Sequence, residues 1–142
     1  MIFNKTTEYS LSVLGFMAMS QDEVFSAEYL HEQLDIPRRY LRKILTELSK
    51  SGFIRSTKGR NGGFVFAKSL EEISLADIIN KVEGTEVMEN CIGGNSKCHA
   101  EQPCVMHEVW FEAKSKMVDT LSFTTLLELR KRNEEKKEKF IM

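Results

Sequence analysis

The sequence has no long hydrophobic run. No apolar stretch approaches the roughly 20 residues that a membrane-spanning helix requires. The first ten residues, MIFNKTTEYS, lack the basic region and apolar core of a secretion signal. These absences predict a soluble protein of the cytoplasm with no membrane partner. With 142 residues, of which 42% are hydrophobic, the chain can form one packed domain and an appendage but not two full domains.

Cysteine is scarce and confined to one segment. All three cysteines, Cys91, Cys98 and Cys104, lie within fourteen positions, together with His99 and close to His107. An odd number of clustered thiols in a reducing cytoplasm argues against a disulfide framework. Because thiolates select zinc or iron–sulfur clusters over hard cations, the segment predicts metal, cluster or thiol-switch chemistry. It contains no Cys-x-x-Cys pair of the kind that zinc ribbons use.

The chain also lacks an overall positive charge. Its formal net charge is −1, which by itself does not indicate a nucleic-acid partner. However, residues 37–68 carry nine basic residues and a single acid, Glu47, so that this segment has a net charge of +8 and the remainder −9. A cationic segment on an acidic body is expected where one surface faces phosphates.

Residues 6–51 have the pattern of three helices. Thr6 or Thr7 can cap a first helix that is apolar on more than one side and therefore mostly buried. Ser26 caps a second helix, and a third, basic helix covers residues 37–51 with apolar positions along one face. The last two helices form a helix-turn-helix.

A β-hairpin is predicted directly after the third helix. Short strands that begin at Phe53 and Phe64 flank the basic, glycine-rich turn at residues 58–63. A helix-turn-helix followed by a basic hairpin is a winged helix, in which the third helix enters the major groove and the hairpin, or wing, contacts phosphates or the minor groove. The residues expected to contact DNA are Arg38, Arg39, Tyr40, Arg42, Lys43, Lys58, Arg60, Asn61 and Gly62.

The C-terminal half is expected to bring the cysteines between two helices. Ser74 caps an acidic helix that Gly84 ends, and Pro103 opens a long helix whose apolar surface is wide enough to contact both its own domain and a second subunit. Ser122 or Thr124 caps a last short helix. We therefore expect a mainly α protein with these parts: a winged helix-turn-helix DNA-binding domain at residues 1–84, a cysteine cluster-binding loop at 85–104, a dimerisation helix region at 105–129, and a charged, disordered tail at 130–142.

These features resemble a known family of bacterial regulators. The shared residues are Glu8-Tyr9-Ser10, Ile36-Pro37 with Tyr40-Leu41 and Ile44-Leu45, Gly59 with Gly62-Gly63-Phe64, and the three-cysteine loop before a long helix. Over residues 1–129 the chain resembles the Rrf-type winged helix-turn-helix regulators, which include IscR-like and NsrR-like members. The resemblance implies a homodimeric transcription factor, usually a repressor. Its binding to double-stranded operator DNA would be controlled by an iron–sulfur cluster that responds to redox state, nitric oxide or iron–sulfur status.

The resemblance also implies a ligand set for the cluster. Cys91, Cys98 and Cys104 would supply three ligands. In IscR-like members a histidine completes a two-iron cluster, and His107 lies three residues after Cys104, on the same helix face. In NsrR-like members a carboxylate from the partner subunit reaches a four-iron cluster, and Glu8 lies at that position, where it could also simply favour the helix start. We favour His107 and a 2Fe–2S cluster, with Glu8 and a 4Fe–4S cluster as the alternative.

Three other classes of protein could contain some of the same features. A zinc-dependent or thiol-switched repressor of the same fold would use the same cysteines without iron. An enzyme is not expected, because no third group orients His99 or His107 and the glycine-rich turn does not close with the Gly-Lys-Ser/Thr of a nucleotide-binding loop. A protein-interaction module without DNA binding would lack a steep salt dependence of DNA affinity.

Overall fold

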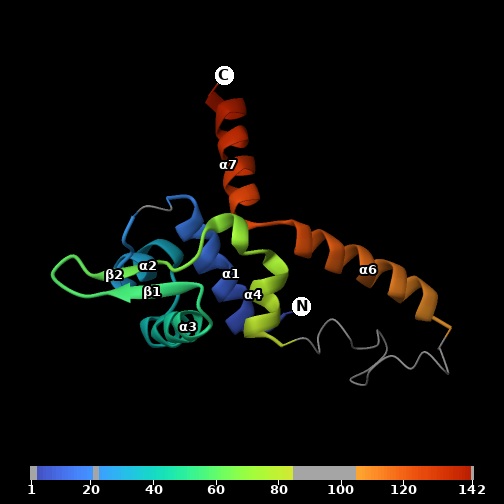
Figure 1. Cartoon of the computed structure of the whole chain (residues 1–142), viewed down its shortest axis with the longest axis horizontal. Helices are drawn as coiled ribbons and strands as arrows, with labels where there is room; N and C mark the ends of the chain where they lie inside the picture. The colour runs from blue at the N-terminus through green and yellow to red at the C-terminus, as the bar shows by residue number, and fades with distance from the viewer. Residues whose placement is uncertain (1–2, 21–22, 85–104, 142) are drawn as a thin grey trace.

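The fold is mainly helical, with one two-stranded sheet, as predicted. The structure, a computed structural model, describes residues 3–20, 23–84 and 105–141. Its elements are α1 (Lys5–Ala18), α2 (Ala27–Leu34), α3 (Arg38–Lys50), β1 (Ile54–Thr57), β2 (Gly63–Phe66), the 3-10 turn η1 (Leu70–Glu72), α4 (Leu75–Val82), α6 (His107–Phe123) and α7 (Leu126–Ile141). Figure 1 shows α1 at the centre of the body, the hairpin on one side, and α6 and α7 projecting away from the body in different directions. No helix of the described ranges is long and apolar enough to cross a membrane.

Helix α1 forms the centre of the hydrophobic core. Val13, Leu14 and Met17 are fully buried, and α1 contacts α2, α3, α4 and α7. The helix begins two or three residues earlier than predicted, because Asn4 is its N-cap and accepts a hydrogen bond from the backbone N–H of Thr7 at 2.9 Å. The prediction of a threonine cap was therefore wrong, and the hydroxyl of Thr7 bonds to another helix instead.

Helices α2 and α3 form the predicted helix-turn-helix. Ser26 caps α2 and accepts a hydrogen bond from the backbone N–H of Tyr29 at 3.1 Å. Asp35 ends α2 in the left-handed region, with a φ of 53°, and turns the chain into α3. The apolar positions of α3 are buried in the core: Leu41, Ile44, Leu45 and Leu48. Helical periodicity thus leaves the basic residues of α3 on its exposed face.

The wing is joined to the helix-turn-helix by backbone hydrogen bonds. Strands β1 and β2 pair antiparallel, with Ile54 opposite Phe66. Phe25, in the connection between α1 and α2, adds a bridge to Phe64. The N–H of Phe25 donates to the carbonyl of Phe64 at 2.9 Å, and the N–H of Phe64 donates back at 2.7 Å. Because the side chain of Phe25 is buried in the core, this bridge fixes β2 of the wing to the body.

Gly63 lies where the wing approaches this connection most closely. A Cβ atom on Gly63 would lie 2.4 Å from the carbonyl oxygen of Phe25, which is backbone and part of the bridge. We expect Gly63→Ala to lower the free energy of unfolding by about 1–3 kcal/mol, because the bridge must shift. Urea denaturation measures this change. Gly15→Ala in α1 is the matched control, since a Cβ there meets nothing within 4 Å; equal losses at both positions would contradict the prediction.

Both ends of α4 agree with the prediction. Ser74 and Asp77 form a capping box, in which each side chain accepts a hydrogen bond at 3.0 Å from the backbone N–H of the other. Gly84, with a φ of +99°, follows the helix. The chain thereby leaves α4 directly before residues 85–104, so that the expected cysteine loop lies outside the described residues.

The helix predicted to start at Pro103 begins instead at His107, because Val105 and Met106 form a turn. Contrary to the prediction from the sequence, His107 therefore does not share a continuous helix with Cys104.

Helix α7 differs from the prediction. The run expected to be disordered from residue 130 onward is helical to Ile141. Ion pairs spaced four residues apart, Arg130 with Glu134 and Arg132 with Glu128, suit a helix. Its first turn is fixed to the body by the buried Leu126, whose N–H donates to the carbonyl of Ile73 at 2.9 Å. The cap is Thr125, whose hydroxyl accepts from the N–H of Glu128 at 3.2 Å, and not Ser122 or Thr124.

Candidate nucleic-acid interface

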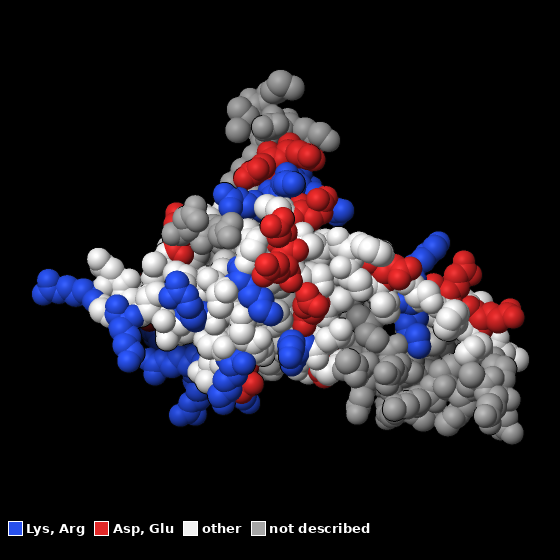
Figure 2. Space-filling view, viewed as in Figure 1, with Lys and Arg blue, Asp and Glu red and all other residues white. Residues whose placement is uncertain are grey.

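A cationic surface covers α3 and the wing. Figure 2 shows Lys and Arg side chains gathered at the left and lower left of the molecule, and Asp and Glu side chains toward α6 and α7. The structure brings eight of the nine expected DNA contacts to this surface. Seven are exposed and Gly62 is half-buried in the turn of the wing: Arg38, Arg39, Arg42 and Lys43 from α3, and Lys58, Arg60, Asn61 and Gly62 from the wing. The elements that carry them are in contact, since α3 packs against β1.

Tyr40 is the expected contact that the structure does not bring to the cationic surface. Its side chain is half-buried and lies against α1. The Tyr40 hydroxyl and the Thr6 hydroxyl are 2.7 Å apart, and the Tyr40 ring meets Tyr9 edge-on with centroids 5.3 Å apart. Through its ring contact with Tyr9 and its hydroxyl contact with Thr6, Tyr40 joins the start of α3 to the first turns of α1.

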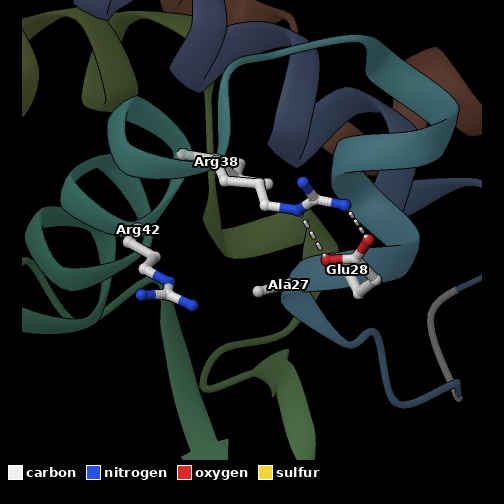
Figure 3. A pocket seen from close by; sticks show the side chains of 5 residues that line it. Ala27, Glu28, Arg38 and Arg42 are labelled. Atoms are coloured by element: carbon white, nitrogen blue, oxygen red, sulfur yellow. Dashed lines mark hydrogen bonds and ion pairs between the residues drawn. The ribbon is translucent and has the colours of Figure 1, made fainter.

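Arg38 is held by Glu28, a residue that no sequence motif marks as functional. Its Nε donates to Oε2 of Glu28 at 3.0 Å and its Nη2 donates to Oε1 at 2.6 Å, as Figure 3 shows. The hydrogen bonds and charge of Arg38 lower the pKa of Glu28 below its ordinary value. A lowered carboxyl pKa means that Glu28 is ionised at neutral pH and that the pair is lost as acid protonates Glu28. The sequence does contain one signal for this pair, because Glu28 and Arg38 carry opposite charges in the first turns of two consecutive helices.

The carboxylate of Glu83 links the end of α4 to the start of α1. It accepts a hydrogen bond from the backbone N–H of Asn4 at 3.1 Å and another from the hydroxyl of Thr7, which is fully buried. Glu83 lies two positions before residue 85. The turn of α1 that it holds also contains Glu8, and the hydroxyl of Thr6 in this turn reaches Tyr40 of α3.

The expected cysteine ligands fall outside the described residues. Cys91, Cys98 and Cys104 all lie in residues 85–104. His107 is the first residue of α6, half-buried, with its ring stacked on Phe111 at a centroid distance of 6.0 Å. Glu8 lies in the first turn of α1, with its carboxylate 3.8 Å from the ammonium of Lys5. Within the described ranges no group of three or more His, Cys, Asp or Glu could hold a metal ion, so the ligand set stays a prediction.

The wing and α3 are expected to contribute differently to DNA binding. We expect Arg60→Ala, at the exposed turn of the wing, to weaken binding to every sequence and to reduce the slope of log affinity against log salt by about 1 per protomer. Arg39→Ala, at the start of α3, should instead relax selectivity at one base position. Fluorescence anisotropy over a salt series, with a preferred duplex and a scrambled one, measures both quantities. Identical slopes and selectivity for the two variants would contradict this division.

A helix-turn-helix with a cationic exposed face, joined to a basic hairpin, defines the chain as a winged helix-turn-helix DNA-binding protein. The sequence model of the Rrf2 family, described as an iron-dependent transcriptional regulator, matches residues 3–132. The chain therefore belongs to the Rrf2 family of transcriptional regulators, which confirms the resemblance drawn from the sequence.

Individual relatives and solved structures agree with this assignment. The chain is 37% identical over 131 residues to an HTH-type transcriptional regulator of Aquifex aeolicus, covering 91% of each protein. It is 31% identical over 137 residues to the regulator NsrR of Oceanobacillus iheyensis, covering 95% of this chain and 93% of the relative. CymR of B. subtilis, described as the global cysteine regulator, superposes with a TM-score of 0.78 at 20% identity, over 92% of this chain and 96% of that one. The oxidised form of Staphylococcus aureus CymR superposes with a TM-score of 0.72 at 26% identity, over 90% of this chain and 94% of that one.

Proposed function

We propose that this Rrf2-family regulator is a repressor that acts in the cytoplasm as a homodimer on double-stranded operator DNA, under the control of an iron–sulfur cluster on its cysteine segment. The observation that carries DNA binding is the cationic surface formed by α3 and the wing. In this surface the basic side chains of α3, a helix that can enter the major groove, lie beside those of the wing, a hairpin that can contact the DNA phosphates.

The exposed apolar residues of α6 support the homodimer. None of the 17 residues of this helix is buried in the single chain. Val109, Phe111 and Phe123 are 72%, 57% and 84% exposed. A helix that stands away from the body with large apolar side chains uncovered is expected to pack against a partner (Figure 1). A twofold dimer would present two recognition helices to two half-sites.

The donor set of the cysteine segment fits an iron–sulfur cluster. Cys91, Cys98 and Cys104 would supply thiolates, with His107 as the fourth ligand or Glu8 as the alternative, and thiolate and imidazole are established ligands of such clusters. When bound, the cluster supplies an oxidant-sensitive centre whose state changes the ligation of these residues.

The contacts of Glu83 support a route from the cysteine segment to the DNA. Glu83 holds Asn4 and Thr7 of the first turn of α1, and Thr6 of the same turn holds Tyr40 of α3. A change in residues 85–104 that displaces Glu83 would therefore alter the support of the recognition helix. In this proposal the ligated segment shifts the population of α3 positions and thereby operator affinity.

A second candidate is a cluster-free repressor of the same fold. The three cysteines would then bind zinc or form a thiol switch. The solved oxidised form of Staphylococcus aureus CymR, 26% identical to this chain, favours this candidate.

Anaerobic purification distinguishes the two candidates. We expect coloured protein that contains iron and sulfide, with Mössbauer spectra of a two-iron cluster that His107→Ala alters and Glu8→Ala does not. A four-iron spectrum altered by Glu8→Ala would instead support the alternative ligand. Colourless protein that contains zinc, or no metal, would favour the second candidate.

Gel-shift titration tests control of DNA binding. Duplexes selected by the protein from a random library serve as the probe, and cluster-loaded and cluster-free protein are compared on the same duplex. We expect their affinities to differ. Indistinguishable affinities would overturn cluster control while leaving the assignment as a DNA-binding regulator in place.

A further inference from the structure

Glu28 occupies one edge of the Arg38 guanidinium and leaves another edge free. A guanidinium carries five N–H donors in a planar fork. The Glu28 carboxylate accepts from Nε and from Nη2, at 3.0 and 2.6 Å, so it binds the side edge. The end edge, formed by Nη1 and the second N–H of Nη2, has no partner among the residues that the structure describes. Its two parallel donors match the O6 and N7 acceptors of guanine.

The pair lies where a recognition helix contacts bases. Arg38 is the first residue of α3, and the N-terminal residues of such a helix contact base edges in the major groove. The side chains of Arg38 and Glu28 are 61% and 54% exposed, so the free edge is accessible. The pair borders a hollow of about 140 Å³ between α2 and α3, which is also lined by Ala27, Leu41 and Arg42 (Figure 3).

The charge of the pair favours a base over a phosphate. Arg42 makes no ion pair within the described ranges, and although its charge helps to lower the pKa of Glu28, its donors are available to a phosphate. Arg38 and Glu28 together are neutral, and the carboxylate repels an approaching phosphate. Guanine offers two acceptors without a net charge, so it does not meet this repulsion.

We infer that Arg38 and Glu28 form a specificity-determining pair. Arg38 reads one guanine in each half-site, and Glu28 is a positioning residue that orients the guanidinium and suppresses its binding to phosphates. This inference rests on the proposed binding to operator DNA and adds the base that one side chain recognises.

Selection from a random duplex library, followed by sequencing, tests the inference. Wild-type protein should enrich guanine at one position of each half-site, and Arg38→Ala should lose that enrichment. Glu28→Gln should reduce it roughly tenfold, because a neutral amide no longer orients the guanidinium. Arg42→Ala is the matched control on the same helix. It should weaken binding to all duplexes while keeping the guanine enrichment.

A salt titration on an unselected duplex separates charge from positioning. Glu28→Gln should bind this duplex more tightly than wild type and steepen the salt slope by about 1 per protomer, because Arg38 is released to a phosphate. Glu28→Asp keeps the charge but shortens the side chain, so it should lose guanine enrichment without the steeper slope. Circular dichroism verifies that each variant is folded.

Wild-type protein that selects no sequence would defeat the proposed function. If wild-type protein selects guanine, and Glu28→Gln and Glu28→Asp select it equally well, this inference alone is overturned.

Discussion

Replacing Leu48 with alanine is expected to lower the free energy of unfolding by about 2–5 kcal/mol. Leu48 is fully buried on the inner face of α3, in the core cluster that also contains Leu14 and Leu30. The shortened side chain loses its transfer free energy and leaves a cavity that a close-packed core fills only in part. Since small domains are stable by roughly 5–15 kcal/mol, this single change removes a large share of the total.

Glu47→Ala is the matched control for Leu48→Ala. Glu47 is the preceding residue of the same helix and is exposed. Its replacement should change the free energy of unfolding by no more than about 0.5 kcal/mol. Urea denaturation of both variants measures the difference. Losses of similar size at residues 47 and 48 would show that α3 does not bury the face described above.

The largest effect on DNA binding is expected from neutralising the exposed face of α3. Arg39, Arg42 and Lys43 are exposed together on this face. Their combined replacement with alanine should lower affinity about a hundredfold or more at moderate salt, since each lost contact to a base or phosphate is worth about 1 kcal/mol or more. The slope of log affinity against log salt should become shallower by up to about 2 per protomer, because the lost phosphate contacts of Arg42 and Lys43 remove about 0.9 each.

A triple variant of α7 controls for total charge. Replacing Lys131, Arg132 and Lys136 with alanine removes the same charge from exposed positions of a different helix. This variant should keep a salt slope within about 1 of wild type, because only contacts with phosphates release counterions. Equal losses of affinity for the two triple variants would mean that α3 is not the DNA-binding face. Circular dichroism checks that both variants remain folded.

The winged helix could be predicted because each of its elements carries a local signal. The apolar spacing of α3, the serine caps of α2 and α4, and the glycines beside the wing all act within a few residues of chain. The α7 prediction was wrong because a mixed-charge run suits both a disordered tail and a helix with ion pairs at four-residue spacing. The domain boundaries, the homodimer and the cluster ligands stay predictions.

The sequence by itself determined the chemistry of the surfaces. It set the two faces of α3 by periodicity, the basic wing by its glycines and cations, and the grouping of three thiols at Cys91, Cys98 and Cys104. Only the tertiary structure decided which of these groups meet. Arg38 pairs with Glu28, 10 positions away in the sequence, and the hydroxyl of Tyr40 bonds to that of Thr6, 34 positions away. Glu83 accepts a hydrogen bond from Thr7, 76 positions away. Such pairings depend on how separate helices pack, and no local period of the chain encodes that.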